Sequence, residues 1–437
     1  MHIPDGYISP LISAGVAVAT VPTWAVATRK VKAVLSNRMI PMLAIFSALS
    51  FTIMMFNVPV PGGTTAHGVG GTLAAIVLGP WAAVITVSVA LIIQALFFGD
   101  GGVLAIFANC LTMAVILPFV GYATYRLISG RAPMMSTRRV WAAGIGGYVG
   151  LTASALAVGF LLGIQPLLFT ENGHALYSPY GLSEAIPAML IAHIFGASVV
   201  EGLITALGLA YLQQRHPEYL TATRAMVSGP DIAEGTPTRR PLWQTAVAII
   251  GVGVVALVGI GLVTGGGDPG HAYGVDWSQV DWPSVVAMLL VVAVIAAIAI
   301  PLAWFLLPRR MRGTGTAFVA AAVLAPLGLI APGFAYGEGS AEDVQAAFGY
   351  IPKGIQDVAS AFSAPLPDYT IPLPFVSQAN PALWQQAVGY EIAGMVGILM
   401  IGAVFWVVAR WYQGRGGSEA GQGESRSAGS AAAGSDT

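Results

Sequence analysis

Ten long stretches with almost no charged residues constrain the fold of this chain more than any other feature. They cover residues 11–27, 40–58, 71–98, 103–127, 140–162, 186–212, 242–263, 285–307, 316–331 and 392–408. A helix needs roughly 17–25 apolar residues to cross a bilayer, so most stretches can form one span each. Only 9% of all residues are charged, against about 25% in a soluble domain. The sequence therefore predicts an all-α polytopic protein of the lipid bilayer.

Basic residues indicate how the chain is oriented, because loops rich in Lys and Arg stay in the cytoplasm. They cluster around residues 29–38, 126–139, 215–240, 309–312 and 410–415. Acidic residues instead collect around 268–281 and 338–368, in the intervening loops. We therefore expect a bacterial plasma-membrane protein with an extracytoplasmic N-terminus and a cytoplasmic C-terminus.

The stretch 71–98 is too long for one helix in a hydrocarbon core of about 30 Å, at about 1.5 Å per residue. Gly79-Pro80 also interrupts it, because proline breaks a helix interior. We predict two segments that meet near Gly79, the first short and partly re-entrant. This division makes the number of crossings between the first two basic loops even, as the charge pattern requires.

The basic segment 214–241 is the expected internal boundary, a cytoplasmic linker between two membrane regions. Residues 1–213 then supply about seven crossings and residues 242–412 about four. Residues 413–437 are rich in Gly, Ser and Ala, a composition typical of disorder.

A candidate metal site begins at residue 1. The α-amino group of Met1, the backbone nitrogen of His2 and the His2 imidazole can chelate one cation. His67 lies in a glycine-rich loop on the same predicted side and can supply a fourth nitrogen. Four planar nitrogens suit Ni(II), Cu(II) or Co(II). The alternative is that both histidines are ordinary surface residues, as polar side chains usually are.

Other polar residues have weaker functional interpretations. The single cysteine, Cys110, excludes an internal disulfide and makes thiolate metal chemistry improbable. Asp100 lies among glycines and is either a turn residue or, with Gln94 and Asn109, a brace for the loop that carries His67. His193 and Glu201 share one apolar stretch, where a hydrogen bond that fixes the fold is at least as plausible as a functional role.

Several motifs of this chain resemble those of the CbiM/NikM family, the substrate-binding (S) components of cobalt and nickel transporters of the energy-coupling-factor (ECF) type. The resemblance covers roughly residues 1–213. Its motifs are Met1-His2-Ile3-Pro4-Asp5-Gly6, Ala66-His67, Leu78-Gly79-Pro80-Trp81, the segment 93–102 followed by Ala108-Asn109, and Ala192-His193 with the segment 201–205.

The resemblance implies a seven-helix S-component fold and a metal held by Met1, His2 and His67. Co(II) or Ni(II) would be the transported substrate, and no organic cofactor is implied. It also implies two kinds of partner, a transmembrane coupling subunit and a pair of cytoplasmic ATPases. The chain itself has no G-x-x-x-x-G-K-[ST] loop, so we expect a transport subunit and not an enzyme. The charge of −1 gives no reason to expect nucleic acid.

The C-terminal half departs from the family pattern. Cobalt and nickel systems often use a small auxiliary membrane protein, and residues 242–412 are interpreted as a fused auxiliary region on topology alone. Two rival functions stay open. A self-sufficient secondary transporter or channel needs charged residues at mid-membrane, for which only His193 and Glu201 qualify. An intramembrane enzyme needs a nucleophile–base pair or an open catalytic metal, and no such motif is present.

Overall fold

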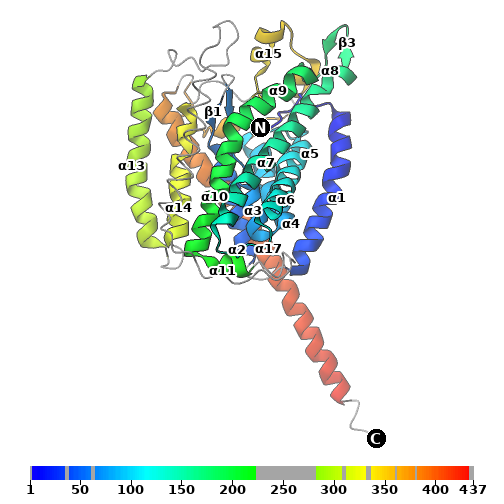
Figure 1. Cartoon of the computed structure of the whole chain (residues 1–437), viewed down its shortest axis with the longest axis vertical. Helices are drawn as coiled ribbons and strands as arrows, with labels where there is room; N and C mark the ends of the chain where they lie inside the picture. Colours follow the sequence, from blue (N-terminus) through cyan, green and yellow to red (C-terminus); the bar gives the residue numbers. More distant parts are fainter. Residues whose placement is uncertain are drawn as a thin grey trace.

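The computed structural model describes residues 2–34, 39–60, 64–222, 282–307, 312–330, 336–359, 362–378 and 381–432. They form a bundle of helices that run mostly along one direction, with two short hairpins at one end (Figure 1). The predicted span at 242–263, the acidic loop at 268–281 and most of the 214–241 linker lie outside the described residues.

The first half follows the predicted spans closely. Its helices are α1 (Pro10–Val34), α2 (Met39–Met55), α3 (Gly71–Leu78), α4 (Pro80–Ile93), α5 (Ile106–Asn109), α6 (Leu117–Ser129), α7 (Thr137–Gly163), α8 (Gln165–Leu168), α9 (Leu182–Ala192), α10 (Ser198–Arg215) and α11 (Pro217–Ala222). The hairpins are β1 (Val58–Val60) with β2 (Thr64–Ala66), and β3 (Thr170–Glu171) with β4 (His174–Ala175), both antiparallel.

Three long membrane helices of this half contain a π-helical turn. The turns are η1 (Gln94–Phe98), η2 (Cys110–Ile116) and η3 (His193–Ala197). Each begins at or directly after a polar residue that the sequence singles out, namely Gln94, Asn109 or His193. Such turns are rare and are found frequently at functional sites.

The second half adds α13 (Trp282–Leu306), α14 (Arg312–Leu324), η5 (Ala325–Ile330), α15 (Ala341–Phe348), α16 (Lys353–Ala359), η6 (Pro367–Tyr369) and α17 (Leu383–Ala432). Seven helices of the described residues are long and apolar enough to span a membrane, five of them in the first half. Apolar α2 is shorter. An all-α polytopic membrane protein is therefore confirmed.

The predicted division of residues 71–98 is also confirmed. Helix α3 ends before Gly79, which has a φ of 89° and a ψ of 152°, and Pro80 starts α4. Proline fits the first position of a helix because that position needs no N–H donor. The chain can therefore change direction at Gly79 with little loss of hydrogen bonding.

Helix α17 continues into the C-terminal tail as far as Ala432 and leaves the bundle (Figure 1). The disorder expected of residues 413–437 stays a prediction. The segment contains no proline, and extending an existing helix avoids the cost of nucleating a new one. The last five residues lie outside the description.

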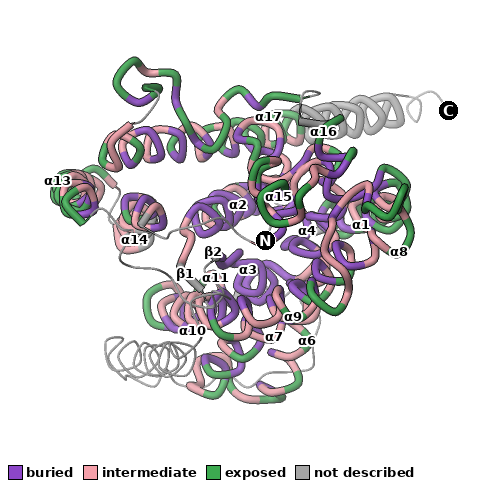
Figure 2. Tube along the Cα trace, turned by 90° about the horizontal axis from the view of Figure 1, so that it is seen from above, coloured by how far each residue is buried: buried purple, intermediate pink, exposed green. Residues whose placement is uncertain are grey.

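The most deeply buried part of the bundle surrounds α3 and α4, and the N-terminus lies above it (Figure 2). The segment just before helix α15 contacts the N-terminal segment, where the Tyr7 hydroxyl donates to the carbonyl of Gly339 at 2.7 Å. Helix α17 packs along α2, and the Tyr390 hydroxyl donates to the carbonyl of Met55 at 2.7 Å. The second half therefore contacts the first both at its end and along its side.

Candidate metal site

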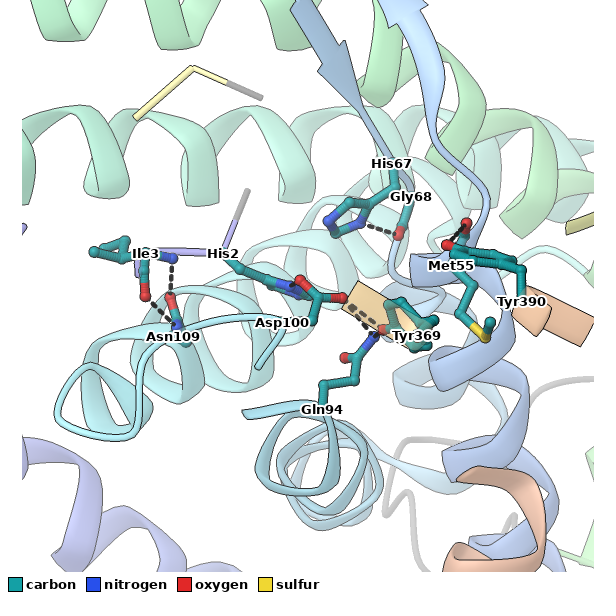
Figure 3. Close-up of polar contacts among 10 residues, drawn as sticks. All are labelled: His2, Ile3, Met55, His67, Gly68, Gln94, Asp100, Asn109, Tyr369 and Tyr390. Atoms are coloured by element: carbon teal, nitrogen blue, oxygen red, sulfur yellow. Dashed lines mark hydrogen bonds and ion pairs between the residues drawn. The ribbon is translucent and has the colours of Figure 1, made fainter. Parts of the chain in front are cut away.

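His2 and His67 lie side by side at the end of the bundle that carries the N-terminus (Figure 3). The centroids of their rings are 4.8 Å apart, and the ring planes are tilted by 54°. Both side chains are almost completely buried, with exposures of 3% and 4%. The structure thus brings together the two imidazoles that the sequence singles out.

Hydrogen bonds fix the N-terminal segment to helix α5 and to the loop that precedes it. The amide of Ile3 donates to Asn109 Oδ1 at 2.8 Å, and Asn109 Nδ2 donates back to the carbonyl of Ile3 at 3.1 Å. Asp5 accepts from the amides of Val103 and Leu104 at 2.8 and 2.7 Å. These bonds determine where His2, the residue before Ile3, enters the bundle.

Glycine at position 102 makes this close approach possible. A Cβ atom there would lie 2.4 Å from the backbone nitrogen of Asp5, far inside van der Waals contact. The amide of Gly102 also donates to the carbonyl of Ile3 at 2.8 Å. The N-terminal segment therefore packs directly against the backbone of the glycine pair 101–102.

A carboxylate on a distant helix anchors the loop that carries His67. Oε2 of Glu201, on α10, accepts from the amides of Val69 and Gly70 at 2.8 and 2.7 Å. Gly70 has a φ of +75°, a conformation that favours glycine. Ser50 donates to the carbonyl of Val69 at 2.7 Å. The loop between β2 and α3 is thus tied to two helices.

Asp100 connects His2 to a small polar cluster (Figure 3). One of its oxygens bonds Nδ1 of His2, and this contact is partly buried. The other accepts from the Tyr369 hydroxyl at 2.6 Å and from Gln94 Nε2 at 3.3 Å. Gln94 Nε2 also donates to the Tyr369 hydroxyl oxygen at 2.8 Å. Asp100 therefore has donors on three sides.

Burial and charge fix the protonation of these groups. Burial alone would raise the pKa of Asp100, but His2, His67 and the hydroxyl of Tyr369 hold that pKa well below its usual value. Burial lowers the pKa of His67 well below its usual value, and the neighbouring His2 lowers it further. Burial and the charge of Asp100 raise the pKa of Tyr369. At neutral pH the cluster thus has an ionised aspartate, a neutral His67 and a protonated tyrosine.

His67 presents one nitrogen for coordination. Its Nδ1 lies 2.8 Å from the carbonyl oxygen of Gly68, which can only accept, so Nδ1 carries the proton and Nε2 keeps a lone pair. Among the described residues, no three His, Cys, Asp or Glu side chains are grouped as a ready-made metal site. A cation between the two imidazoles would therefore need further ligands.

The predicted site residues have different outcomes. His2 and His67 come together, whereas Met1 lies outside the described residues. Among the described residues, Asn109 bonds Ile3, and Asp100 bonds His2, Gln94 and Tyr369. Glu201 accepts from the loop that carries His67, and the role of Gln94, Asp100 and Asn109 in bracing that loop stays a prediction. His193 is buried, its Nδ1 donates to the carbonyl of Met189 at 2.7 Å, and its Nε2 has no hydrogen-bond partner among the described residues.

Tyr369 is the site residue that sequence reasoning missed. Its only signal in the sequence is its place in the proline-rich segment 364–369, on the same predicted side of the membrane as His2. Its partner Asp100 is 269 positions away, so no local pattern reports the contact.

Together, the spans and the paired buried imidazoles define a multi-pass membrane protein with a nitrogen-rich site at one end. Residues 2–219 match the family model for the CbiM cobalt uptake substrate-specific transmembrane region. Over 419 residues the chain is 38% identical to the fused nickel transport protein NikMN of Rhodobacter capsulatus, covering 92% of this chain and 95% of that protein. The chain belongs to this family of cobalt and nickel transport proteins.

Two further similarities each cover about half of the chain. A putative metal transport protein of Methanocaldococcus jannaschii is 44% identical over 230 residues, which are 52% of this chain and 99% of that protein. A solved structure described as a truncated transition metal transporter is 54% identical and covers 49% of this chain and 100% of its own, with a TM-score of 0.46.

Proposed function

We propose that this chain is the metal-capturing membrane subunit of an ATP-driven ECF-type importer for cobalt or nickel. One Co(II) or Ni(II) ion binds at the extracytoplasmic face, held by the Met1 amine, the His2 backbone nitrogen, the His2 imidazole and His67. A coupling subunit and an ATPase pair on other chains drive release to the cytoplasm. The observation that carries this proposal is the contact between the buried rings of His2 and His67.

Covalent geometry selects the nitrogen of His2 that completes the chelate. The backbone nitrogen and Nδ1 of one histidine close a six-membered ring with a metal, whereas Nε2 points away from its own backbone. Nδ1 of His2 bonds Asp100 in the structure. Ion binding therefore requires His2 to exchange this partner for the metal, and Asp100 stays beside the new complex.

Charge balance gives Asp100 a further role. A divalent cation in a buried site carries a large desolvation cost unless opposite charges accompany it. Loss of the proton from the His2 backbone amide would supply one negative charge, and the ionised Asp100 supplies the second. The loaded site is then close to neutral, which favours transfer of the ion out of water.

The test is metal binding by purified full-length protein with a native N-terminus. We expect one bound Ni(II) or Co(II) per chain by calorimetry and by mass spectrometry of metal content. A short N-terminal extension removes the free amine and should abolish tight binding. His67→Ala should weaken it by at least about a hundredfold, because a ligand to a charged centre is lost from a buried site.

His174→Ala is the matched control, because that imidazole is exposed and its ring contacts Tyr350 at a tilt of 50°. Its affinity should equal that of the wild type. Full affinity in the extended protein, or in His67→Ala, would refute the proposed ligand set. Metal uptake by this chain in cells without any partner ATPase would favour the self-sufficient transporter.

A further inference from the structure

Among the described residues of the second half, the segment 362–378 reaches the polar cluster around Asp100. Residues 362–378 pass over the end of the bundle, and the amide of Leu366 donates to the carbonyl of Phe97 at 2.9 Å. The ring of Tyr369 stacks on Phe98 with 4.8 Å between centroids. This places the Tyr369 hydroxyl against Asp100, in the interior of the molecule (Figure 3).

The backbone at this point adopts a conformation that is rare for residues other than glycine. Asp368 and Tyr369 have φ values of 50° and 57°, in the left-handed region. Non-glycine residues persist there only where the surroundings determine the conformation, and such positions concentrate at ligand clamps and switch regions. The surroundings here are the aromatic rings of Phe98, Phe51 and Tyr390, all within contact of Tyr369.

The hydrogen bonds of Asp100 change when an ion binds as proposed above. Nδ1 of His2 leaves the carboxylate for the metal, so Asp100 loses its closest partner. Gln94 and Tyr369 then remain as its donors, and Gln94 is the more distant of the two at 3.3 Å against 2.6 Å. The carboxylate of Asp100 is partly buried, and a carboxylate withdrawn from water is less stable without donors than with one strong hydrogen bond.

We propose that Tyr369 is a positioning residue for metal binding, which acts through Asp100 and not as a ligand. Its hydroxyl holds the carboxylate beside the ion after His2 has turned to the metal, so the second half of the chain completes the site of the first. This inference rests on the proposed function, because it assumes that the ion binds between His2 and His67.

Tyr369→Phe tests this role in purified full-length protein loaded with Ni(II). It removes the hydroxyl and keeps the stacked ring. We expect affinity to fall about tenfold, the usual effect of one lost hydrogen bond to a charged group, with faster Ni(II) release to a chelator. The stoichiometry and the ligand-field spectrum should stay as in the wild type, because the nitrogen ligands are unchanged.

Tyr390→Phe is the matched control. It removes another buried hydroxyl of the same aromatic cluster, which donates to the carbonyl of Met55 and not to Asp100. Its affinity should stay within about twofold of the wild type. Equal Ni(II) affinities of Tyr369→Phe and Tyr390→Phe would overturn the proposal.

A double-mutant cycle tests the route through Asp100. In an Asp100→Asn background, Tyr369→Phe should change the affinity by less than about twofold, because the group on which it acts is gone. The same tenfold loss in both backgrounds would show that Tyr369 acts by packing and would overturn the proposal. Wild-type protein that binds neither Ni(II) nor Co(II) would instead refute the proposed function itself, so the two failures are distinguishable.

Discussion

At the scale of single residues, His67 is prepared for coordination by its burial. The ring excludes a proton at neutral pH because burial and the nearby His2 lower its pKa. Its Nδ1–H is occupied by the carbonyl of Gly68, so Nε2 is left with its lone pair. A metal therefore does not have to displace a proton from this ring, which favours fast binding.

The same burial predicts a pH-dependent stability. The pKa of His67 is about 6.5 in the unfolded chain and lower in the folded one, so the unfolded state takes up the proton first. The contribution to the free energy of unfolding is complete above pH 6.5 and is lost as the pH falls below it, by up to about 1.4 kcal/mol per pH unit. We expect the free energy of unfolding of chelator-treated protein to fall more steeply between pH 7.5 and 5.5 in the wild type than in His67→Gln. Parallel pH profiles would contradict this.

At the scale of elements, two anchors position the site, and they come from different helices. The N-terminal segment is held by Asn109 of α5 and by the turn before that helix, and the His67 loop is held by Glu201 of α10. Gly102 and Gly70 let the backbone approach closely or turn at these points. Each imidazole is therefore oriented by the rigid helical frame, although both lie in segments without regular structure.

The Glu201 anchor gives a graded prediction. Glu201→Ala leaves two buried N–H groups without an acceptor, at about 1–3 kcal/mol each, and should lower both the unfolding temperature and Ni(II) affinity. Glu201→Gln keeps one acceptor oxygen, so its unfolding temperature and its Ni(II) affinity should both fall by less. Glu171→Ala, at an exposed position of β3, is the control and should match the wild type. Thermal unfolding and calorimetry measure the series; wild-type affinity in Glu201→Ala would show that the loop needs no such anchor.

The elements also show what a sequence can and cannot predict. Helix positions and the break at Gly79 follow from hydropathy, length and proline chemistry, which are local properties. The charge pattern predicts only that His2 and His67 lie on the same side of the membrane, and their pairing is implied by the family resemblance. The partners of Glu201 and Asp100 do not follow, because Val69 is 132 positions from Glu201 and Tyr369 is 269 from Asp100. Such contacts depend on tertiary packing that no periodicity encodes.

At the scale of the whole molecule, charge separates the two ends of the bundle. Among the described residues, basic side chains collect at the end opposite to His2, in the last turns of α1, α6 and α10 and at the start of α7. Lys353 is an exception at the site end. Since Lys and Arg stay in the cytoplasm, the His2 site is expected to face the opposite compartment, where an importer must capture its ion.

Labelling of introduced cysteines can test this orientation with little background, because the natural Cys110 is completely buried. Glu171→Cys places an exposed thiol in the β3–β4 hairpin at the site end, and Pro133→Cys places one in the basic turn between α6 and α7. In intact cells, a membrane-impermeant maleimide should label the first and not the second; after lysis it should label both. The wild-type chain is the control for Cys110 and should stay unlabelled. Labelling of Pro133→Cys alone in intact cells would invert the topology and place the imidazoles on the cytoplasmic side, where they would receive an ion after transport and not before it.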